Sequence, residues 1–164
     1  MGHPGVAGDV EHERIPPHDR THLDRVWETK ERIKHHDGYL RQAYDFFSTS
    51  YENNTAHVYI EDDVAAFAVV RDDGYLLFLG VAPEHRGRGL GRRIVEDIGS
   101  DHRELSCHTR ENNTNALEFY HHLGFEIQRE VEGYYRNGET ALYLVRAEGT
   151  SLRNKITGVI RGER

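Results

Sequence analysis

The chain has 164 residues, of which 37% are hydrophobic, and its formal net charge is −7 at pH 7. The length fits a single domain, and the negative charge argues against a nucleic-acid partner. A single cysteine, Cys107, excludes an intrachain disulfide and a cysteine zinc site, and no histidine spacing indicates a metal. No apolar run approaches a membrane span and no signal-peptide core begins the chain, so we expect a cytoplasmic protein without a membrane partner.

The sequence of the first part of the chain predicts a partly disordered N-terminal segment followed by two helices. Residues 1–18 are rich in glycine, proline, histidine and charge, so we expect partial disorder, with a short edge strand over 10–15. Residues 21–24 resemble a capping box, and the apolar spacing after them predicts a helix ending near Asp37 and Gly38. Apolar residues at three- and four-residue steps predict a second helix over 40–51.

Three strands are predicted next. Residues 56–60 alternate apolar and polar side chains, as in a half-buried strand, whereas 64–70 are almost all apolar, as in a central strand. Residues 72–74 form a hairpin turn, and a third strand covers 75–81. Gly80 inside that strand indicates a bulge or a close approach of backbones.

The remaining pattern predicts a helix over 90–98, a strand over 105–109, a helix over 113–123 and two further strands over 125–131 and 141–145. Asn137 and Gly138 offer the turn between the last two strands. Residues 19–146 therefore form the expected domain, and 147–164 are a C-terminal appendix that could be helical. This order with a mixed sheet indicates an α/β or α+β fold.

A glycine-rich turn, His85-Arg86-Gly87-Arg88-Gly89-Leu90-Gly91-Arg92, joins an apolar strand to an amphipathic helix. Glycines permit positive φ, so the turn can direct several amides, together with the helix N-terminus, at one phosphate. The spacing fits neither the dinucleotide fingerprint nor the P-loop. An arginine-rich surface turn is the alternative interpretation of this stretch.

A second motif follows one strand later: Asn113-Thr114-Asn115-Ala116-Leu117-Glu118-Phe119-Tyr120, continuing through Gly124 to Phe125. Together with Arg86, Gly89 and Gly91, it resembles the two signatures of the GCN5-related N-acetyltransferases, the GNAT superfamily. The resemblance covers about residues 55–146. It implies the GNAT fold, a mixed central β-sheet with splayed central strands flanked by helices, and acetyl-CoA as co-substrate without a metal.

The resemblance also implies roles for particular residues. Backbone groups of the strand before the turn would hold the pantetheine arm and polarise the thioester, the turn would bind the pyrophosphate, and Asn113 would bond the arm. The residues assigned to acetyl-CoA in this way are Leu79, Val81, Arg86, Gly87, Arg88, Gly89, Leu90, Gly91, Arg92 and Asn113. Tyr120 would protonate the leaving thiolate. An ordinary N-cap and a core tyrosine are the alternatives for Asn113 and Tyr120.

The general base and the acceptor site follow a narrower resemblance, to the branch that acetylates ribosomal-protein N-termini. That branch has a glutamate twelve residues before the tyrosine, where this chain has His108, which could also be a polar residue at a strand end. Histidine suits the role of general base because its unperturbed pKa lies near the pH at which an enzyme works. Tyr134 and Tyr135 match paired tyrosines that hold a peptide backbone in that branch, although they could simply pack within a hairpin.

We therefore expect an N-acetyltransferase in which an amine attacks acetyl-CoA directly, without an acyl-enzyme. Strand alternation places Cys107 on the face opposite His108, which argues against a cysteine nucleophile. The preferred acceptor is a protein or peptide N-terminal amine. The alternatives are a small amine, such as a polyamine, amino acid or aminoglycoside, and a non-catalytic acyl-CoA sensor, which the presence of Tyr120 disfavours. The expected state is a monomer or homodimer.

Overall fold

A computed structural model describes residues 9–147, so the expectations for residues 1–8 and for most of the C-terminal appendix lie outside the described residues. In chain order the elements are β1 (Glu11–Ile15), α1 (Leu23–Asp37), α2 (Tyr44–Asn53), β2 (Thr55–Glu61), β3 (Asp63–Val70), β4 (Leu76–Val81), the 3-10 turn η2 (Pro83–His85), α3 (Leu90–Gly99), β5 (Glu104–Arg110), α4 (Thr114–His122), β6 (Glu126–Val131) and β7 (Ala141–Ala147). The α/β fold class predicted from the sequence is confirmed.

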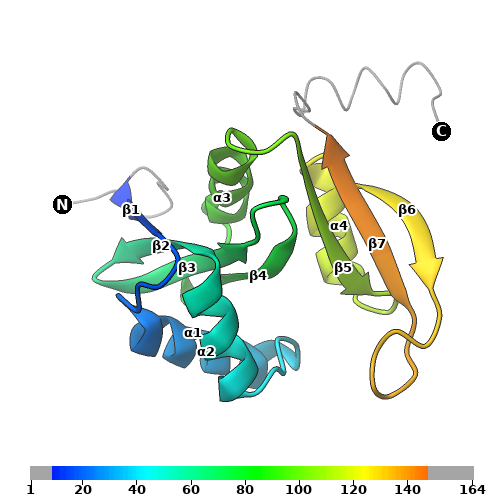
Figure 1. The fold of residues 1–164 in the computed structure, drawn as a ribbon, viewed down its shortest axis with the longest axis horizontal. Helices are drawn as coiled ribbons and strands as arrows, with labels where there is room; N and C mark the ends of the chain where they lie inside the picture. The colour runs from blue at the N-terminus through cyan, green and yellow to red at the C-terminus, as the bar shows by residue number, and fades with distance from the viewer. Residues whose placement is uncertain (1–8, 148–164) are drawn as a thin grey trace. The chain divides into compact units, whose positions relative to one another are not determined.

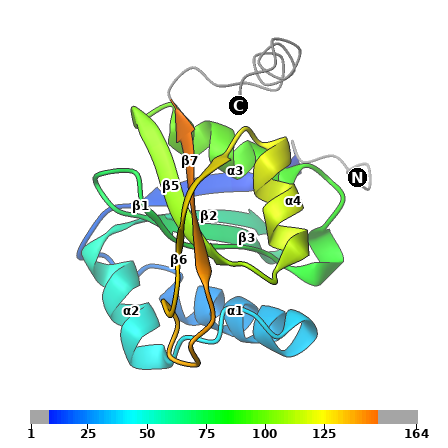
Figure 2. The same ribbon diagram turned by 90° about the vertical axis from the view of Figure 1, so that its right-hand side faces the viewer.

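The described chain forms two compact units. The first contains residues up to 72 and 76–98, and the second contains 73–75 and the residues from 99 onward. In the first unit an antiparallel sheet has the order β1-β2-β3-β4. Helices α1 and α2 lie on one side of this sheet and α3 on the other (Figures 1 and 2). The predicted edge strand is confirmed as β1, which pairs only with β2 in the described ladder.

The core of the first unit lies between its sheet and the α1–α2 layer. Phe47 of α2, Phe67 of β3 and Phe78 of β4 are all buried, with the Phe47 ring 4.8 Å from that of Phe78 and 6.0 Å from that of Phe67. From α1, Val26 and Ile33 reach the same cluster, as the seven-residue spacing on one helical face requires. The apolar face predicted for α1 is therefore its buried face.

Gly80 of β4 lies close to this core, but its nearest neighbours are side chains, not the backbone that the sequence predicted. A Cβ atom at this position would lie 2.8 Å from Cδ1 of Ile33 and 3.3 Å from Cδ1 of Leu40. Leu40 itself has φ +58°, a conformation that a helix does not allow. The second helix therefore begins at Tyr44 rather than at Leu40, because the side chain of Leu40 packs against β4 instead of continuing a helical turn.

Two further sequence predictions in this unit were wrong. The N-cap of α1 is His22, in the left-handed region and without a side-chain cap; the hydroxyl of Thr21 instead donates to Asp19 Oδ1 at 2.6 Å. Strand β2 is not half buried, because its polar side chains have partners inside the structure. His57 bonds the ring of His12, and the hydroxyl of Tyr59 donates to Asp97.

The second unit is built on an antiparallel sheet in the order β5-β7-β6. Helix α4 lies beside this sheet (Figure 2). Ahead of β4, Tyr75 forms a parallel bridge with Ser106 of β5. The turn predicted at Asn137 and Gly138 is confirmed: Gly138 has φ +86°, and its amide donates to Tyr135 O at 2.8 Å.

Candidate active site

The glycine-rich turn adopts an open backbone conformation just before α3. Gly87 and Gly89 have φ +79° and +80°, and no atom lies within 4 Å of a Cβ built on either. Only glycine adopts this conformation without strain, so the sequence keeps the backbone of the turn accessible. Such a turn at a helix N-terminus suits a phosphate group, which amides and the helix dipole both attract.

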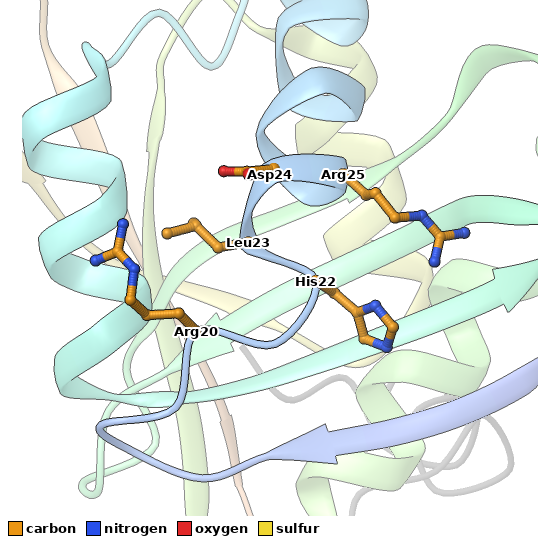
Figure 3. Close-up of a pocket in the computed structure, with 5 residues that line it drawn as sticks. All are labelled: Arg20, His22, Leu23, Asp24 and Arg25. Carbon is orange, nitrogen blue, oxygen red and sulfur yellow. The ribbon is translucent and has the colours of Figure 1, made fainter.

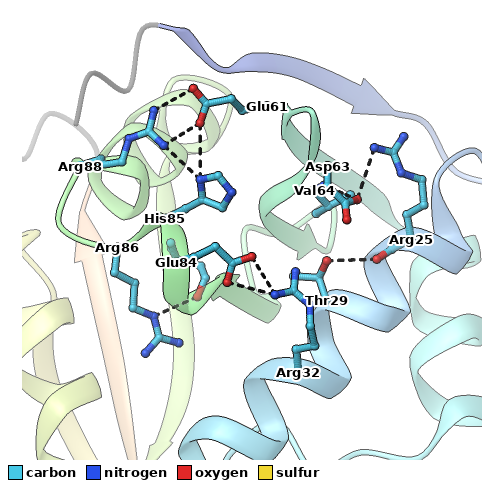
Figure 4. Close-up of polar contacts among 11 residues, drawn as sticks. Arg25, Thr29, Arg32, Glu61, Asp63, Val64, Glu84, His85, Arg86 and Arg88 are labelled. Carbon is cyan, nitrogen blue, oxygen red and sulfur yellow. Dashed lines mark hydrogen bonds and ion pairs between the residues drawn. The ribbon is translucent and has the colours of Figure 1, made fainter. Parts of the chain in front are cut away.

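Arg86 and Arg88 of this turn are held by carboxylates from distant parts of the first unit. Arg86 Nη2 lies 2.7 Å from Asp37 Oδ2, and its Nε donates to Val81 O at 3.0 Å. Arg88 donates to both oxygens of Glu61, at 2.6 and 3.1 Å (Figure 4). These guanidinium groups therefore brace the turn, a function that the motif alone does not reveal. The same contact with Arg88 lowers the pKa of Glu61.

The strand before the turn offers backbone groups at one edge. Among the described residues, the ladder of β4 runs to β3 only, with Leu79 opposite Ala68 and Val81 opposite Ala66. An edge strand presents peptide groups that can bond an extended ligand. Leu79 and Val81 both belong to this edge strand, and the carbonyl of Val81 accepts from Arg86 Nε.

His108 lies in an aromatic cluster of the second unit. Its Nδ1 is 2.7 Å from the hydroxyl of Tyr75 and 3.5 Å from that of Tyr134. The Tyr134 ring stacks on the imidazole, with centroids 4.4 Å apart, and the Tyr143 ring lies 5.0 Å away. Burial, followed by the charge of Arg129, lowers the pKa of His108. This environment favours a neutral imidazole, the form that accepts a proton.

Tyr75 is a candidate that the sequence analysis did not identify as functional. It precedes β4 by one residue and lies 33 positions from His108 in the chain. Its only signal in the sequence is a tyrosine at the start of the strand that leads into the glycine turn. Burial, followed by the nearby Tyr134, raises the pKa of Tyr75, so its hydroxyl keeps its proton.

Tyr120 faces Cys107 rather than His108. Burial raises the pKa of Tyr120 well above its usual value, and its hydroxyl is hydrogen bonded with Cys107. The Tyr120 ring also packs edge-on against Phe125, at 5.0 Å. Burial raises the pKa of Cys107 to about 12, so the thiol stays protonated and does not act as a nucleophile. Cys107 and His108 are neighbours on β5, and their side chains therefore point to opposite faces.

Asn113 caps α4, as the motif suggested. Its Oδ1 accepts from the backbone N–H of Ala116 at 3.1 Å. The side-chain NH₂ group is not used by this cap, so the capping role and a contact with a ligand are compatible.

The two tyrosines of the β6–β7 hairpin lie in a braced turn. Tyr134 packs edge-on against Tyr135 at 5.0 Å, and the Arg110 guanidinium lies 3.9 Å from the centroid of the Tyr135 ring. Arg110 also forms an ion pair with Glu139. Since Tyr134 stacks on His108, the structure brings three of the predicted site residues into one cluster: His108, Tyr134 and Tyr135.

A separate pocket lies at the start of α1, where Arg20, His22, Leu23, Asp24 and Arg25 line it (Figure 3). Figure 3 shows the side chains of Arg20 and Arg25 directed away from each other. None of the predicted site residues lines this pocket, so it contributes nothing to the expected chemistry.

Comparison with known proteins identifies the family. Residues 52–127 match the model of the "Acetyltransferase (GNAT) domain". The 5-NmdU N-acetyltransferase of Pseudomonas phage PaMx11 is 31% identical over 97 residues, which cover 53% of this chain and 69% of that protein. The chain belongs to the GNAT family of acetyltransferases. It is therefore an acyltransferase enzyme, and the expected fold and family are confirmed.

Two further likenesses extend this GNAT assignment. N-alpha-acetyltransferase 30 of Xenopus laevis is 33% identical over 76 residues, 43% of this chain but only 28% of that protein. The crystal structure of the ribosomal-protein-S18-alanine N-acetyltransferase of Escherichia coli superposes with a TM-score of 0.68 at 19% identity. That alignment covers 86% of this chain and 96% of the other, and it shows a shared fold.

Within residues 9–147, no helix is long and apolar enough to cross a membrane. No group of three or more histidine, cysteine or acidic side chains in the same range is placed to hold a metal ion.

Proposed function

We propose that this GNAT protein transfers the acetyl group of acetyl-CoA to the N-terminal α-amine of a protein or peptide, by direct attack of the amine. The observation that carries the proposal is the cluster in which the neutral imidazole of His108 lies between Tyr75 and Tyr134. The names of two proteins with likeness to this chain, N-alpha-acetyltransferase 30 and the ribosomal-protein-S18-alanine N-acetyltransferase, support this acceptor class.

In this proposal His108 is the base. When Nδ1–H donates to the Tyr75 hydroxyl, Nε2 keeps its lone pair and can accept a proton from the acceptor ammonium. The pKa of His108 is lowered by burial, so the imidazole is unprotonated at neutral pH. An N-terminal amine, with a pKa of about 7.7–8.0, is deprotonated by such a base far more readily than a lysine at about 10.4.

Tyr120 is the acid. Its raised pKa keeps the hydroxyl protonated, so it can donate a proton to the sulfur atom that leaves as the amide forms. Cys107 of β5 lies beside this hydroxyl and, after burial, also raises the pKa of Tyr120. Tyr120 lies on the Cys107 face of β5 and His108 on the other face, so the proposal requires the tetrahedral intermediate to lie where both side chains reach it.

The residues of the first unit fit the phosphate groups of acetyl-CoA. The open backbone at Gly87 and Gly89 precedes the N-terminus of α3, and a Cβ at either glycine would stand in the space around the turn. Acetyl-CoA, when bound, supplies the activated acetyl thioester. We assign its pyrophosphate to the backbone amides of residues 87–91 and to the side chain of Arg92. Arg86 and Arg88 instead stabilise the conformation of the turn through their contacts with Asp37 and Glu61.

We assign the acceptor to the hairpin tyrosines. Tyr134 packs directly on the imidazole, so a peptide held against its ring would present its amine to His108. A small amine has no main chain that Tyr134 and Tyr135 could contact.

A second acceptor class is the one in the name of the phage relative, 5-NmdU. That relative shares more of its length with this chain than N-alpha-acetyltransferase 30 does, which favours testing it. We rank it second because the cluster of His108 with the hairpin tyrosines favours a peptide acceptor.

The test offers acetyl-CoA with each of four acceptors: a lysine-free peptide with a free N-terminus, an N-terminally blocked peptide with one lysine, spermidine, and 5-NmdU. Released thiol and product mass give kcat/KM for each. The proposal requires the first peptide to have the highest value, and the double variant Tyr134→Ala/Tyr135→Ala to remove that preference. A higher value for any other acceptor would overturn the N-terminal assignment.

A further inference from the structure

An arginine lies opposite His108 across the second sheet, two strands away. The register places His108 of β5 opposite Tyr143 of β7, and Tyr143 opposite Arg129 of β6. Directly opposed residues of a sheet point to the same face, so all three side chains share the His108 face. The Arg129 guanidinium carbon lies 4.4 Å from the centroid of the Tyr143 ring, which lies 5.0 Å from the imidazole. A single aromatic ring therefore separates the cation from the proposed base.

Arg129 has no carboxylate partner of its own in the part of the chain that the structure describes, and its side chain is exposed. Arg110, the other cation on this face, is already paired with Glu139. Glu126 of β6 shares the face with Arg129 but forms no ion pair with it among residues 9–147. Stacking on Tyr143 holds the guanidinium in place while its charge stays available to a ligand.

The distances suit a peptide whose amine lies at His108. Consecutive Cα atoms are about 3.8 Å apart, so the Cα atom of the second residue of an extended acceptor lies about that far from the Cα atom of the first. An aspartate or glutamate side chain at that position spans the remaining gap to Arg129. A guanidinium binds a carboxylate with two parallel hydrogen bonds, which gives both affinity and geometric selectivity.

We propose that Arg129 determines acceptor specificity, by favouring N-termini with an acidic second residue and disfavouring those with a basic one. The inference rests on the proposed N-terminal acetyltransferase function and deepens it. The charged groups that the strands of this sheet place on the His108 face are Arg129 and Glu126 on β6, Glu104 and Arg110 on β5, and His108 itself, with Glu139 paired to Arg110. Arg129 also acts on the base, because its charge contributes to the lowered pKa of His108.

The test uses three peptides that differ only at the second residue: aspartate, asparagine and lysine. For the unaltered protein we expect kcat/KM to be about fivefold higher with aspartate than with asparagine, the size of a partly exposed ion pair. Arg129→Gln should bring this ratio close to one, and Arg129→Glu should invert it. Arg129→Lys keeps the charge without the planar fork, so part of the preference should remain.

The control substitution is Arg103→Gln. Arg103 is exposed and lies five residues before His108 in the chain. An extended chain rises about 3.3 Å per residue, so these five residues separate it from the imidazole. The control should leave the ratio unchanged. Equal ratios in the unaltered protein and in Arg129→Gln would overturn the inference. So would a preference for lysine at the second residue.

A second readout separates this inference from the proposed function. The imidazole of His108 is titrated by NMR, without any acceptor, in the unaltered protein and in Arg129→Gln. Loss of the cation should raise the pKa of His108. If the asparagine peptide is acetylated but neither the ratio nor this pKa changes, only the inference fails. If no peptide is acetylated while the pKa rises, the peptide assignment fails, and with it the specificity that we assign to Arg129.

Discussion

The hydroxyl of Tyr75 lies 2.7 Å from Nδ1 of His108, although the two residues are 33 positions apart in the chain. A second hydroxyl, that of Tyr134, lies 3.5 Å from the same nitrogen. The imidazole is thus oriented through Nδ1, and Nε2 remains for chemistry.

Tyr75→Phe should therefore lower kcat/KM by about tenfold, because one oriented hydrogen bond is lost. Tyr134→Phe removes the longer contact and keeps the stacked ring, so its effect on a small-amine acceptor should be weaker. Steady-state kinetics on both variants gives the comparison. A Tyr75→Phe enzyme with unchanged kcat/KM would show that this hydroxyl does not position the base.

The pH profile should reflect His108. Its pKa is lowered below the usual 6.5, first by burial and then by Arg129. The neutral form is the active base, so its contribution to the rate is present at neutral pH and is lost as pH falls through the lowered pKa. In kcat/KM profiles, this acidic limb should lie below pH 6.5 and should be missing in His108→Ala. An acidic limb that is the same in both proteins would assign it to another group.

Tyr120→Phe should lower kcat by roughly 10²-fold, the range for a positioned acid, with little change in Kd for acetyl-CoA. Cys107→Ala is the matched variant, because it removes the hydrogen-bonding neighbour of the same hydroxyl but not the hydroxyl itself. Its kcat should change by no more than a few fold. A larger loss in Cys107→Ala than in Tyr120→Phe would favour a cysteine mechanism.

Gly89→Glu should weaken acetyl-CoA binding at least tenfold, because φ +80° strains any side chain and the new carboxylate repels phosphate. Gly138→Ala offers a control, since it has φ +86° and equally open surroundings, but lies in the hairpin. Calorimetry should show near-normal acetyl-CoA affinity for the control. Equal affinities in both variants and the unaltered protein would remove the glycine turn from the cofactor site.

Gly80→Ala should destabilise the protein by about 1–3 kcal/mol, because its Cβ would lie 2.8 Å from the buried Cδ1 of Ile33. Urea unfolding curves measure the change. An unfolding free energy equal to that of the unaltered protein would show that the core relaxes around the added methyl group without cost.

Stability should also fall in mild acid, through the pair formed by His12 and His57. His12 Nε2 lies 2.8 Å from His57 Nδ1, and this bond needs one ring to be a neutral acceptor. Burial lowers the pKa of His12, an effect that Asp97 opposes and Arg93 supports. The folded protein therefore binds fewer protons here than the unfolded chain, and stability is lost as pH drops below 6.5.

His12→Gln removes this titrating ring, so its unfolding free energy should fall less between pH 8 and pH 5.5 than that of the unaltered protein. The control is His35→Gln, at an exposed position of α1. If the two variants show the same pH dependence, the pair contributes nothing to acid sensitivity.

The sequence by itself determined the features that are encoded locally. A strand, three glycines and an amphipathic helix in succession defined the turn, since positive φ and helical spacing are properties of neighbouring residues. The second motif likewise placed Asn113 at the start of a helix, and the structure shows the cap.

Only the tertiary structure decided which side chains meet. Arg86 and Arg88 looked like phosphate ligands until folding placed Asp37 and Glu61 beside them, 49 and 27 positions away. The burial of β2, the start of α2 at Tyr44 and the link from Tyr75 to His108 were likewise beyond the sequence. The physical reason is common to all of them: charge pairing and packing depend on distances in space, which the local periodicity of a chain does not contain.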